Sequence, residues 1–100
     1  MYIYKFIDEY GTLIYVGITK NKNRRVSQHI KADLKRINDA RYIYYSYHCD
    51  KYYIQRLEKW MIYKYKPKYN KIGGKKAVVT RELEDEDWTL FGGTDNEWNE

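Results

Sequence analysis

The stretch YIYKFIDEYGTLIYVGI, residues 2–18, decides the fold. Its two ends, residues 2–7 and 13–18, are rich in β-branched and aromatic residues and alternate in character, which is typical of β-strands. Between them lies Asp8-Glu9-Tyr10-Gly11, whose acids and glycine suit a tight reversal of the chain. The sequence therefore predicts that a β-hairpin opens the fold.

Two helices and a third strand are expected after the hairpin. Asn21 or Asn23 can cap a helix that begins near Lys22 and ends at residues 38–39. Its apolar residues recur at 3.6-residue spacing and are Val26, Ile30, Leu34 and Ile37. Residues 42–47 are aromatic and β-branched without helical periodicity, which indicates a strand. Asp50 then caps a second helix, which Pro67 ends.

The predicted order is β-β-α-β-α, a small α+β domain in which a three-stranded antiparallel sheet is flanked by helices. We assign residues 1–72 to this domain and residues 73–100 to a C-terminal extension with an acidic tail. A chain of 100 residues has room for one small core. It has neither an apolar run long enough for a membrane span nor the apolar centre of a signal peptide, so a cytoplasmic protein is expected. The lone Cys49 is expected to be a buried strand residue.

The charges are divided unevenly along the chain. Residues 1–80 carry 18 Lys and Arg against 6 Asp and Glu, whereas residues 81–100 carry one Arg against 8 acids. A basic body with interleaved aromatic residues favours nucleic acid as a partner. The alternative is that the positive charge serves only to keep the protein soluble. Most of the 13 tyrosines are expected to pack in the sheet with their hydroxyls reaching water, and base stacking would explain a minority.

Glu58 stands out on the second predicted helix. At about 100° per residue its direction falls inside the apolar arc of that helix, where an unpaired carboxylate would be costly. It is therefore expected either to pair, with Arg56 or Lys59 as candidates, or to bind a cation. On the first helix Arg25 and His29 lie one turn apart, close enough to act on one substrate group.

These residue types suit the hydrolysis of a phosphodiester bond. That reaction needs an activated water, neutralisation of the transition state and help for the departing 3′ oxygen. One Mg²⁺ or Mn²⁺ ion keeps several waters, so the carboxylate of Glu58 is sufficient as its protein ligand. Arg25 can neutralise the phosphate through its planar fork. Tyr4 and Tyr15 can position the water, and His29 can accept its proton near pH 7.

Residues 2 to about 72 resemble the GIY-YIG nuclease family. The first family motif ends in a tyrosine that Tyr4 matches, and the second motif, Tyr-Ile-Gly, appears here as Tyr15-Val16-Gly17. Lys20-Asn21 and Tyr-x-Pro-Lys-Tyr-Asn at residues 65–70 also look familiar. The resemblance implies metal-dependent DNA cleavage, with Glu58 as the metal ligand. The positions that it places in catalytic roles are Tyr4, Tyr15, Arg25, His29, Glu58 and Asn70.

The chain departs from the family pattern at Tyr2, where the first motif has a glycine. A strand glycine serves close packing more often than chemistry, so the departure is expected to be mild. If the larger side chain narrows the cleft, substrate range or activity would suffer.

Backbone phosphate contacts are expected from lysines and arginines near the two motifs and beyond the second helix. These residues are Lys20, Arg24, Lys64, Lys66, Lys68 and Lys71. Such contacts position nucleic acid without reading its sequence. Since no sequence-reading motif is recognisable, defined cleavage would require a protein partner, a homodimer or a structured substrate.

The acidic tail leaves three alternatives open, because Trp88, Leu90 and Phe91 follow its acids. Its aromatic residues would pack on the body, engage a protein partner, or place acids where they mimic nucleic acid and occlude the basic surface. For the whole chain, the leading hypothesis is a small endonuclease, in a bacterial, phage or mobile-element setting. Its rivals are a catalytically weak nucleic-acid-binding module and a protein-interacting regulator on the same fold.

Overall fold

The computed structural model describes residues 1–32, 34–71, 79 and 81–91. Its elements are β1 (Tyr2–Ile7), β2 (Leu13–Thr19), α1 (Lys22–Ala32), α2 (Leu34–Asp39), β3 (Tyr42–Tyr47), α3 (Lys51–Tyr65), a 3₁₀ turn η1 (Asp85–Asp87) and β4 (Thr89–Leu90). All strand pairs are antiparallel and the strand order is β2-β1-β3-β4. The predicted α+β class and the positions of its first three strands are confirmed.

The predicted number of strands was wrong, because the sheet has four strands and not three. The added strand β4 comes from the C-terminal extension and pairs with Tyr44 and Tyr45 of β3. It has only two residues and both are exposed, so it carries no alternation of buried and exposed positions that a sequence pattern could show.

The hairpin turn is built by its own side chains. The carboxylate of Asp8 accepts hydrogen bonds from the backbone N–H groups of Tyr10 and Thr12, at 3.0 and 2.8 Å. Gly11 adopts a φ of +82°, a conformation that glycine reaches without steric cost. These local bonds fix the register in which β1 and β2 pair.

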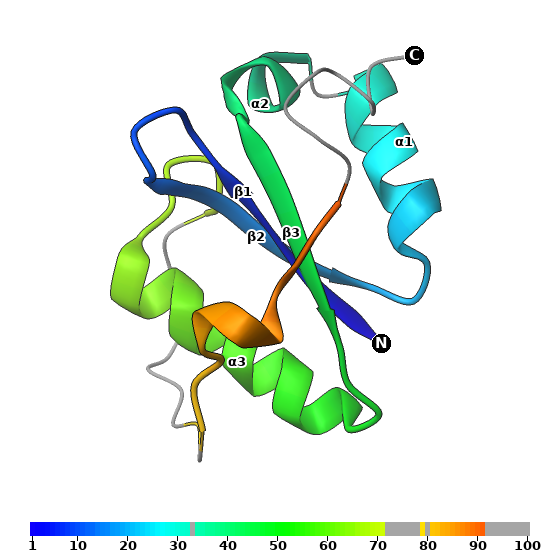
Figure 1. The fold of residues 1–100 in the computed structure, drawn as a ribbon, viewed down its shortest axis with the longest axis vertical. Helices are drawn as coiled ribbons and strands as arrows, with labels where there is room; N and C mark the ends of the chain where they lie inside the picture. The colour runs from blue at the N-terminus through cyan, green and yellow to red at the C-terminus, as the bar shows by residue number, and fades with distance from the viewer. Residues whose placement is uncertain (33, 72–78, 80, 92–100) are drawn as a thin grey trace.

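Helices cover both faces of the sheet, with α1 and α2 on one side and α3 on the other (Figure 1). Val26 of α1 and Ile37 of α2 pack with Tyr4 and Phe6 of β1. On the other face Ile54, Leu57 and Met61 of α3 pack with Ile3 and Val16. The alternation along β1 thus divides the core into two layers, and Tyr4 lies in the layer beneath α1.

The single helix expected over residues 22–39 is divided into α1 and α2. Three residues of its predicted apolar stripe are confirmed, because Val26 and Ile37 are buried in one cluster and Ile30 packs against it. The fourth, Leu34, has a side chain that lies outside the described part of the structure. A pattern that places these residues on one face does not distinguish one helix from two short helices that follow the same surface.

The expected start and end of α3 are confirmed. Asp50 is the N-cap, and its carboxylate accepts hydrogen bonds from the N–H groups of Tyr52 and Tyr53. Lys66 ends the helix in a left-handed conformation, with φ of 48°, just before the buried Pro67. Among the described residues, no helix has the length and apolar character needed to cross a membrane.

The expectation for Cys49 was wrong, because its side chain is exposed. β3 ends at Tyr47 and α3 begins at Lys51, so Cys49 lies in the connection between them. The aromatic and β-branched run that predicted the strand stops at Tyr47, two residues before Cys49.

The described part of the acidic tail packs on the body, as the first of the three alternatives predicts. Leu83 and Trp88 join the core cluster of α3, and Phe91 joins the cluster of α1. The Tyr53 hydroxyl donates a hydrogen bond to the Arg81 carbonyl at 2.7 Å. The Lys5 ammonium lies 4.2 Å from the centre of the Trp88 ring. The packing leaves a protein partner and occlusion of the basic surface as untested predictions.

We predict that Trp88→Ala releases this tail. Loss of about 1–2 kcal/mol of packing should raise the population in which the bond after Arg81 is accessible, and with it tryptic cleavage there, about 5- to 30-fold. The product, residues 82–100, contains no further Lys or Arg and can be followed by mass spectrometry. Leu90→Ala, which changes an exposed side chain of β4, is the control. Equal cleavage rates of both variants would contradict the docking role of Trp88.

Candidate active site

The Tyr4 hydroxyl is the centre of a cluster of site residues on the α1 face of the sheet. Tyr4 is 2% exposed, and its hydroxyl is hydrogen-bonded to Nε2 of His29 at 2.9 Å. Nε of Arg25 donates a hydrogen bond to the same hydroxyl oxygen at 3.2 Å. Strand β1 and helix α1 thus bring together three residues that are 21 and 25 positions apart in the sequence.

Gly17 makes room for this cluster. It lies opposite Tyr4 in the pairing of β1 with β2. A Cβ atom at residue 17 would lie 2.4 Å from the Tyr4 hydroxyl oxygen and 2.5 Å from Cζ, far inside contact distance. Sequence analysis identified Gly17 only as part of a motif and missed this packing role, although a glycine inside a strand is itself a signal of close approach.

Tyr15 and His29 complete the aromatic part of the cluster. The ring centres of Tyr15 and His29 are 5.3 Å apart, and those of Tyr15 and Tyr4 are 6.0 Å apart. Phe6 packs beside Tyr15 against the imidazole, with its ring centre 5.1 Å from that of His29 and 5.4 Å from that of Tyr15. His29 is 1% exposed, so its hydrogen bond with Tyr4 gives it a polar connection within the cluster.

The electrostatics keep Arg25 charged and Tyr4 protonated. Burial, followed by the nearby Tyr15, raises the pKa of Tyr4, while Arg25 opposes the rise. The hydrogen bond to Tyr4 is the main cause that raises the pKa of Arg25. Nη1 of Arg25 also donates to Oε1 of Gln28 at 3.1 Å. The guanidinium is therefore held at two points while its side chain stays half-buried, open to an anion from solvent.

Glu58 lies on α3, the helix that covers the opposite face of the sheet from α1. Its side chain is half-buried, and burial raises the pKa of its carboxyl, an effect that Lys59 opposes. Within the described part of the chain, its carboxylate makes no hydrogen bond or ion pair. The printed hydrogen bonds and ring contacts join Tyr4, Arg25, His29 and Tyr15, and no hydrogen bond or ion pair among the described residues links Glu58 to them.

Among the described residues Glu58 does not form the expected ion pair with Arg56 or Lys59, and cation binding, the other expectation, stays a prediction. A half-buried carboxylate that forms no ion pair among the described residues is disfavoured by its burial and would be stabilised by a bound cation. Over the described residues no group of three or more His, Cys, Asp and Glu could hold a metal ion. An ion here would therefore depend on Glu58 and water, a ligand set that a hard divalent cation such as Mg²⁺ accepts.

Asn70 holds the outer edge of β2. Its Oδ1 accepts a hydrogen bond from the N–H of Val16 and its Nδ2 donates to the Val16 carbonyl, both at 2.9 Å. The N–H of Tyr69 donates to the Ile14 carbonyl at 3.1 Å. Because β2 is an edge strand, these bonds satisfy groups that would otherwise face solvent or another chain. The Asn70 amide thus acts on the strand that carries Tyr15 and Gly17.

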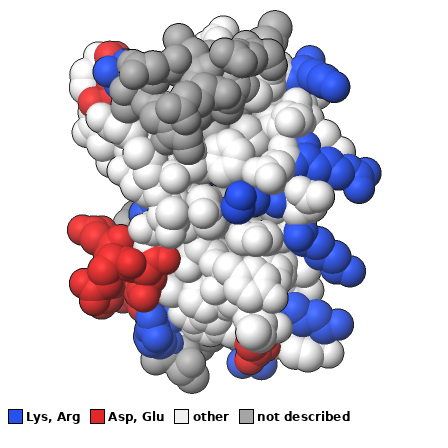
Figure 2. Space-filling view, turned by 45° about the vertical axis from the view of Figure 1, so that its right-hand side comes forward, with Lys and Arg blue, Asp and Glu red and all other residues white. Residues whose placement is uncertain are grey.

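The six residues expected to contact phosphate are all exposed, and they are Lys20, Arg24, Lys64, Lys66, Lys68 and Lys71. Two of them form ion pairs, Lys64 with Glu82 and Lys68 with Asp39. Figure 2 shows lysine and arginine side chains along its right-hand edge and a group of acidic side chains at its left-hand edge, where basic side chains also lie. In this view the main acidic group is separated from the row of lysines and arginines at the right-hand edge.

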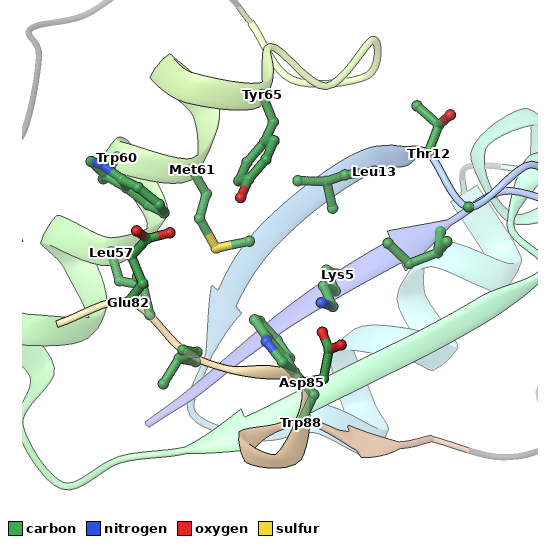
Figure 3. Close-up of a pocket in the computed structure, with 13 residues that line it drawn as sticks. Lys5, Thr12, Leu13, Leu57, Trp60, Met61, Tyr65, Glu82, Asp85 and Trp88 are labelled. Carbon is green, nitrogen blue, oxygen red and sulfur yellow. The ribbon is translucent and has the colours of Figure 1, made fainter.

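A cavity of about 400 Å³ lies on the α3 face, between α3, the hairpin and the tail. Figure 3 shows the indoles of Trp60 and Trp88, the thioether of Met61 and the ammonium of Lys5 around it. The residues that line it include none of those expected to act in catalysis or phosphate binding. This cavity is distinct from the cluster around Tyr4.

Comparison with known proteins identifies a family. The model of the GIY-YIG catalytic domain matches residues 1–70, from β1 to Asn70. Comparisons with curated proteins and with solved structures gave no match. The matched segment includes all six positions proposed for catalysis and ends where Asn70 binds the edge of β2.

We predict that Gly17→Ala is destabilising only while the Tyr4 ring is present. The new methyl group must displace the phenol, which should cost about 1–3 kcal/mol of unfolding free energy. In a Tyr4→Leu background the atoms that clash are gone, so Gly17→Ala should be neutral or slightly stabilising, because alanine has less backbone entropy to lose. Urea denaturation of the four proteins gives the coupling energy. The same cost in both backgrounds would contradict the contact.

We also predict that Glu58→Gln stabilises the protein near pH 7. A raised carboxyl pKa means that the folded state binds more protons than the unfolded state between the two pKa values, so wild-type stability falls as pH rises through that window. The advantage of Glu58→Gln should therefore vanish below the ordinary carboxyl pKa of 4.5.

Thermal denaturation across this pH range, with and without Mg²⁺, measures both effects. Mg²⁺ should stabilise the wild type and leave Glu58→Gln unchanged. Glu9→Gln, at an exposed carboxylate of the hairpin turn, is the matched control. A pH-independent difference, or equal Mg²⁺ effects in both variants, would argue against a cation at Glu58.

Proposed function

Because the chain belongs to the GIY-YIG nuclease family, we propose that it is a metal-dependent endonuclease that hydrolyses phosphodiester bonds in DNA. The observation that carries the proposal is the convergence of Arg25 and His29 on the Tyr4 hydroxyl. A fixed cation, a titratable imidazole and a buried phenol then act within one hydrogen-bonded group. Family membership supports nuclease activity in general, and the choice of DNA and of a divalent ion is our proposal.

Arg25 is proposed to bind the scissile phosphate. Its guanidinium is fixed by Tyr4 and Gln28, so little side-chain entropy remains to be lost when an anion binds. Its planar donors match phosphate oxygens, and their positive charge opposes the negative charge that develops in the transition state. The exposed Lys20 and Arg24 flank this position in the sequence and are proposed to contact neighbouring phosphates.

Tyr4, Tyr15 and His29 are proposed to position the attacking water and to take up its proton. The high pKa of Tyr4 keeps its hydroxyl protonated at neutral pH, so it acts as a hydrogen-bonding relay and not as a phenolate. The proton would pass through this hydroxyl to Nε2 of His29, which is in direct contact with it. Asn70 would contribute by holding β2, and with it Tyr15, in place.

Glu58 would hold one Mg²⁺ or Mn²⁺ ion. When bound, such an ion lowers the pKa of its waters and neutralises charge on the leaving oxygen. The half-buried carboxylate of Glu58 forms no ion pair in the described part of the chain, which supports this assignment. The exposed Lys64, Lys66, Lys68 and Lys71 follow Glu58 in the chain and are proposed to hold the DNA backbone beyond it. A protein partner bound by the acidic tail, or a homodimer, would supply specificity.

The test is cleavage of supercoiled plasmid and of labelled duplex, branched and single-stranded DNA in Mg²⁺, Mn²⁺ or EDTA. We predict metal-dependent cleavage that falls at least about 100-fold in Arg25→Ala and in Glu58→Ala. Binding measured by fluorescence anisotropy in EDTA should persist in Glu58→Ala. Arg56→Ala, which removes an exposed arginine from α3, should cleave at the wild-type rate. Intact binding without cleavage of any substrate would favour the catalytically weak binding module instead.

A further inference from the structure

Three tyrosines form an aromatic surface beside the Tyr4 cluster, on the same face of the sheet. Tyr2 lies two residues before Tyr4 on β1, and the register pairs Tyr2 with Tyr47 and Tyr4 with Tyr45. The ring centres of Tyr2 and Tyr47 are 5.1 Å apart, and those of Tyr2 and Tyr45 are 5.8 Å apart. We call Tyr2, Tyr45 and Tyr47 the tyrosine platform.

The platform is open to solvent at its outer end. Tyr47 is 56% exposed, and Tyr2 and Tyr45 are half-buried. Further along β1, Tyr4 and Phe6 are buried in the cluster that contains Val26 of α1. On this face of the sheet, the two residues from Tyr4 to Tyr2 thus separate the buried core from an accessible aromatic surface.

A lysine ammonium lies over the platform. Nζ of Lys22 is 4.8 Å from the ring centre of Tyr45, 5.9 Å from that of Tyr2 and 5.2 Å from that of Phe91. Lys22 stands one helical turn before Arg25 on α1. Aromatic rings next to a cation are the combination that holds single-stranded nucleic acid, with bases on the rings and phosphates on the cation.

We propose that the tyrosine platform stacks an unpaired nucleobase adjacent to the phosphate bound at Arg25. This rests on the proposed nuclease function and names its substrate class: a strand that is single-stranded next to the cleaved bond. Residues two positions apart on a strand are separated by about 6.6–6.8 Å, a step that one nucleotide can span. A base paired within a duplex has its faces covered by its neighbours and cannot stack on the rings.

Stacking on this platform would tolerate any base, because every base offers a π-face. The platform therefore selects the structure of the substrate and not its sequence. The proposal also gives Tyr2 a role. Its ring contacts both other platform tyrosines and so connects the exposed Tyr47 to Tyr45, which lies opposite Tyr4 in the strand pairing.

The experiment measures binding in EDTA of a short single-stranded oligonucleotide that carries one 2-aminopurine, and of the same strand with an abasic site or a complementary strand. The wild type should change the 2-aminopurine fluorescence on binding and should prefer the base to the abasic site about 5- to 100-fold. Tyr47→Ala and Tyr2→Ala should reduce that preference about tenfold or more. Tyr2→Phe should retain it, since the ring is kept.

The control is Tyr10→Ala, which removes an 83% exposed tyrosine at the hairpin turn and should leave binding unchanged. Tyr47 is exposed, so its substitution reports on stacking even if Tyr2→Ala is unstable. Equal affinity for base and abasic strands, or a preference that survives both alanine substitutions, would overturn the platform.

Cleavage in Mg²⁺, assayed with the same strands, separates this inference from the nuclease proposal. Base-dependent binding without any cleavage would support the platform and count against the nuclease function. Cleavage that is equally fast for base-containing, abasic and fully paired strands would support the nuclease function and overturn the platform.

Discussion

The close contact between the Tyr4 ring and the backbone of Gly17 is the constraint on which the site depends. It requires that β1 and β2 pair in one register, because a slip of one residue would turn Tyr4 to the face that α3 covers. Only with that register does the phenol lie beneath α1, where its hydroxyl meets Arg25 and His29. The hairpin turn fixes the register from one end, through the bonds of the Asp8 carboxylate. The hydrogen bonds of the hairpin turn and the absence of a side chain at Gly17 thus position the cluster of Tyr4, Arg25 and His29, which comes from two distant segments.

The two faces of the sheet carry different features of the protein. The α1 face carries the hydrogen-bonded cluster and the tyrosine platform, whereas the α3 face carries an apolar layer against which the tail packs. Glu58 lies on α3 and Asn70 follows that helix in the sequence. The Asn70 side chain reaches the edge of β2 and binds the backbone of Val16. The edge of β2 is therefore the place where the C-terminal end of the family-matched segment is tied to the strand that carries Tyr15.

Features set by local chemistry could be predicted from the sequence. The alternation in residues 2–18 gave both strands, and Asp50 and Pro67 gave the bounds of α3, because caps and breakers act on their own neighbours. Features set by contacts between distant segments could not. β4 is too short to have a pattern, and Cys49 lies beyond a strand whose end no local signal marks. The grouping of Tyr4 with Arg25 and His29 required the resemblance to a family, since each residue alone is more often structural.

The separation of charge explains how an acidic tail can belong to a protein proposed to bind DNA. Two of the described acids of the tail form ion pairs with residues of α3 or of the tail: Glu82 with Lys64 and Asp87 with Arg81. Arg25 instead lies on α1, across the sheet from that helix. Since charges in physiological salt act over about 8 Å, the acids of the tail repel a polyanion from their own surroundings without neutralising Arg25 or Lys22. The tail, held by Trp88 and by β4, would then favour approach of DNA to the face that carries Arg25, where we propose that the phosphate binds.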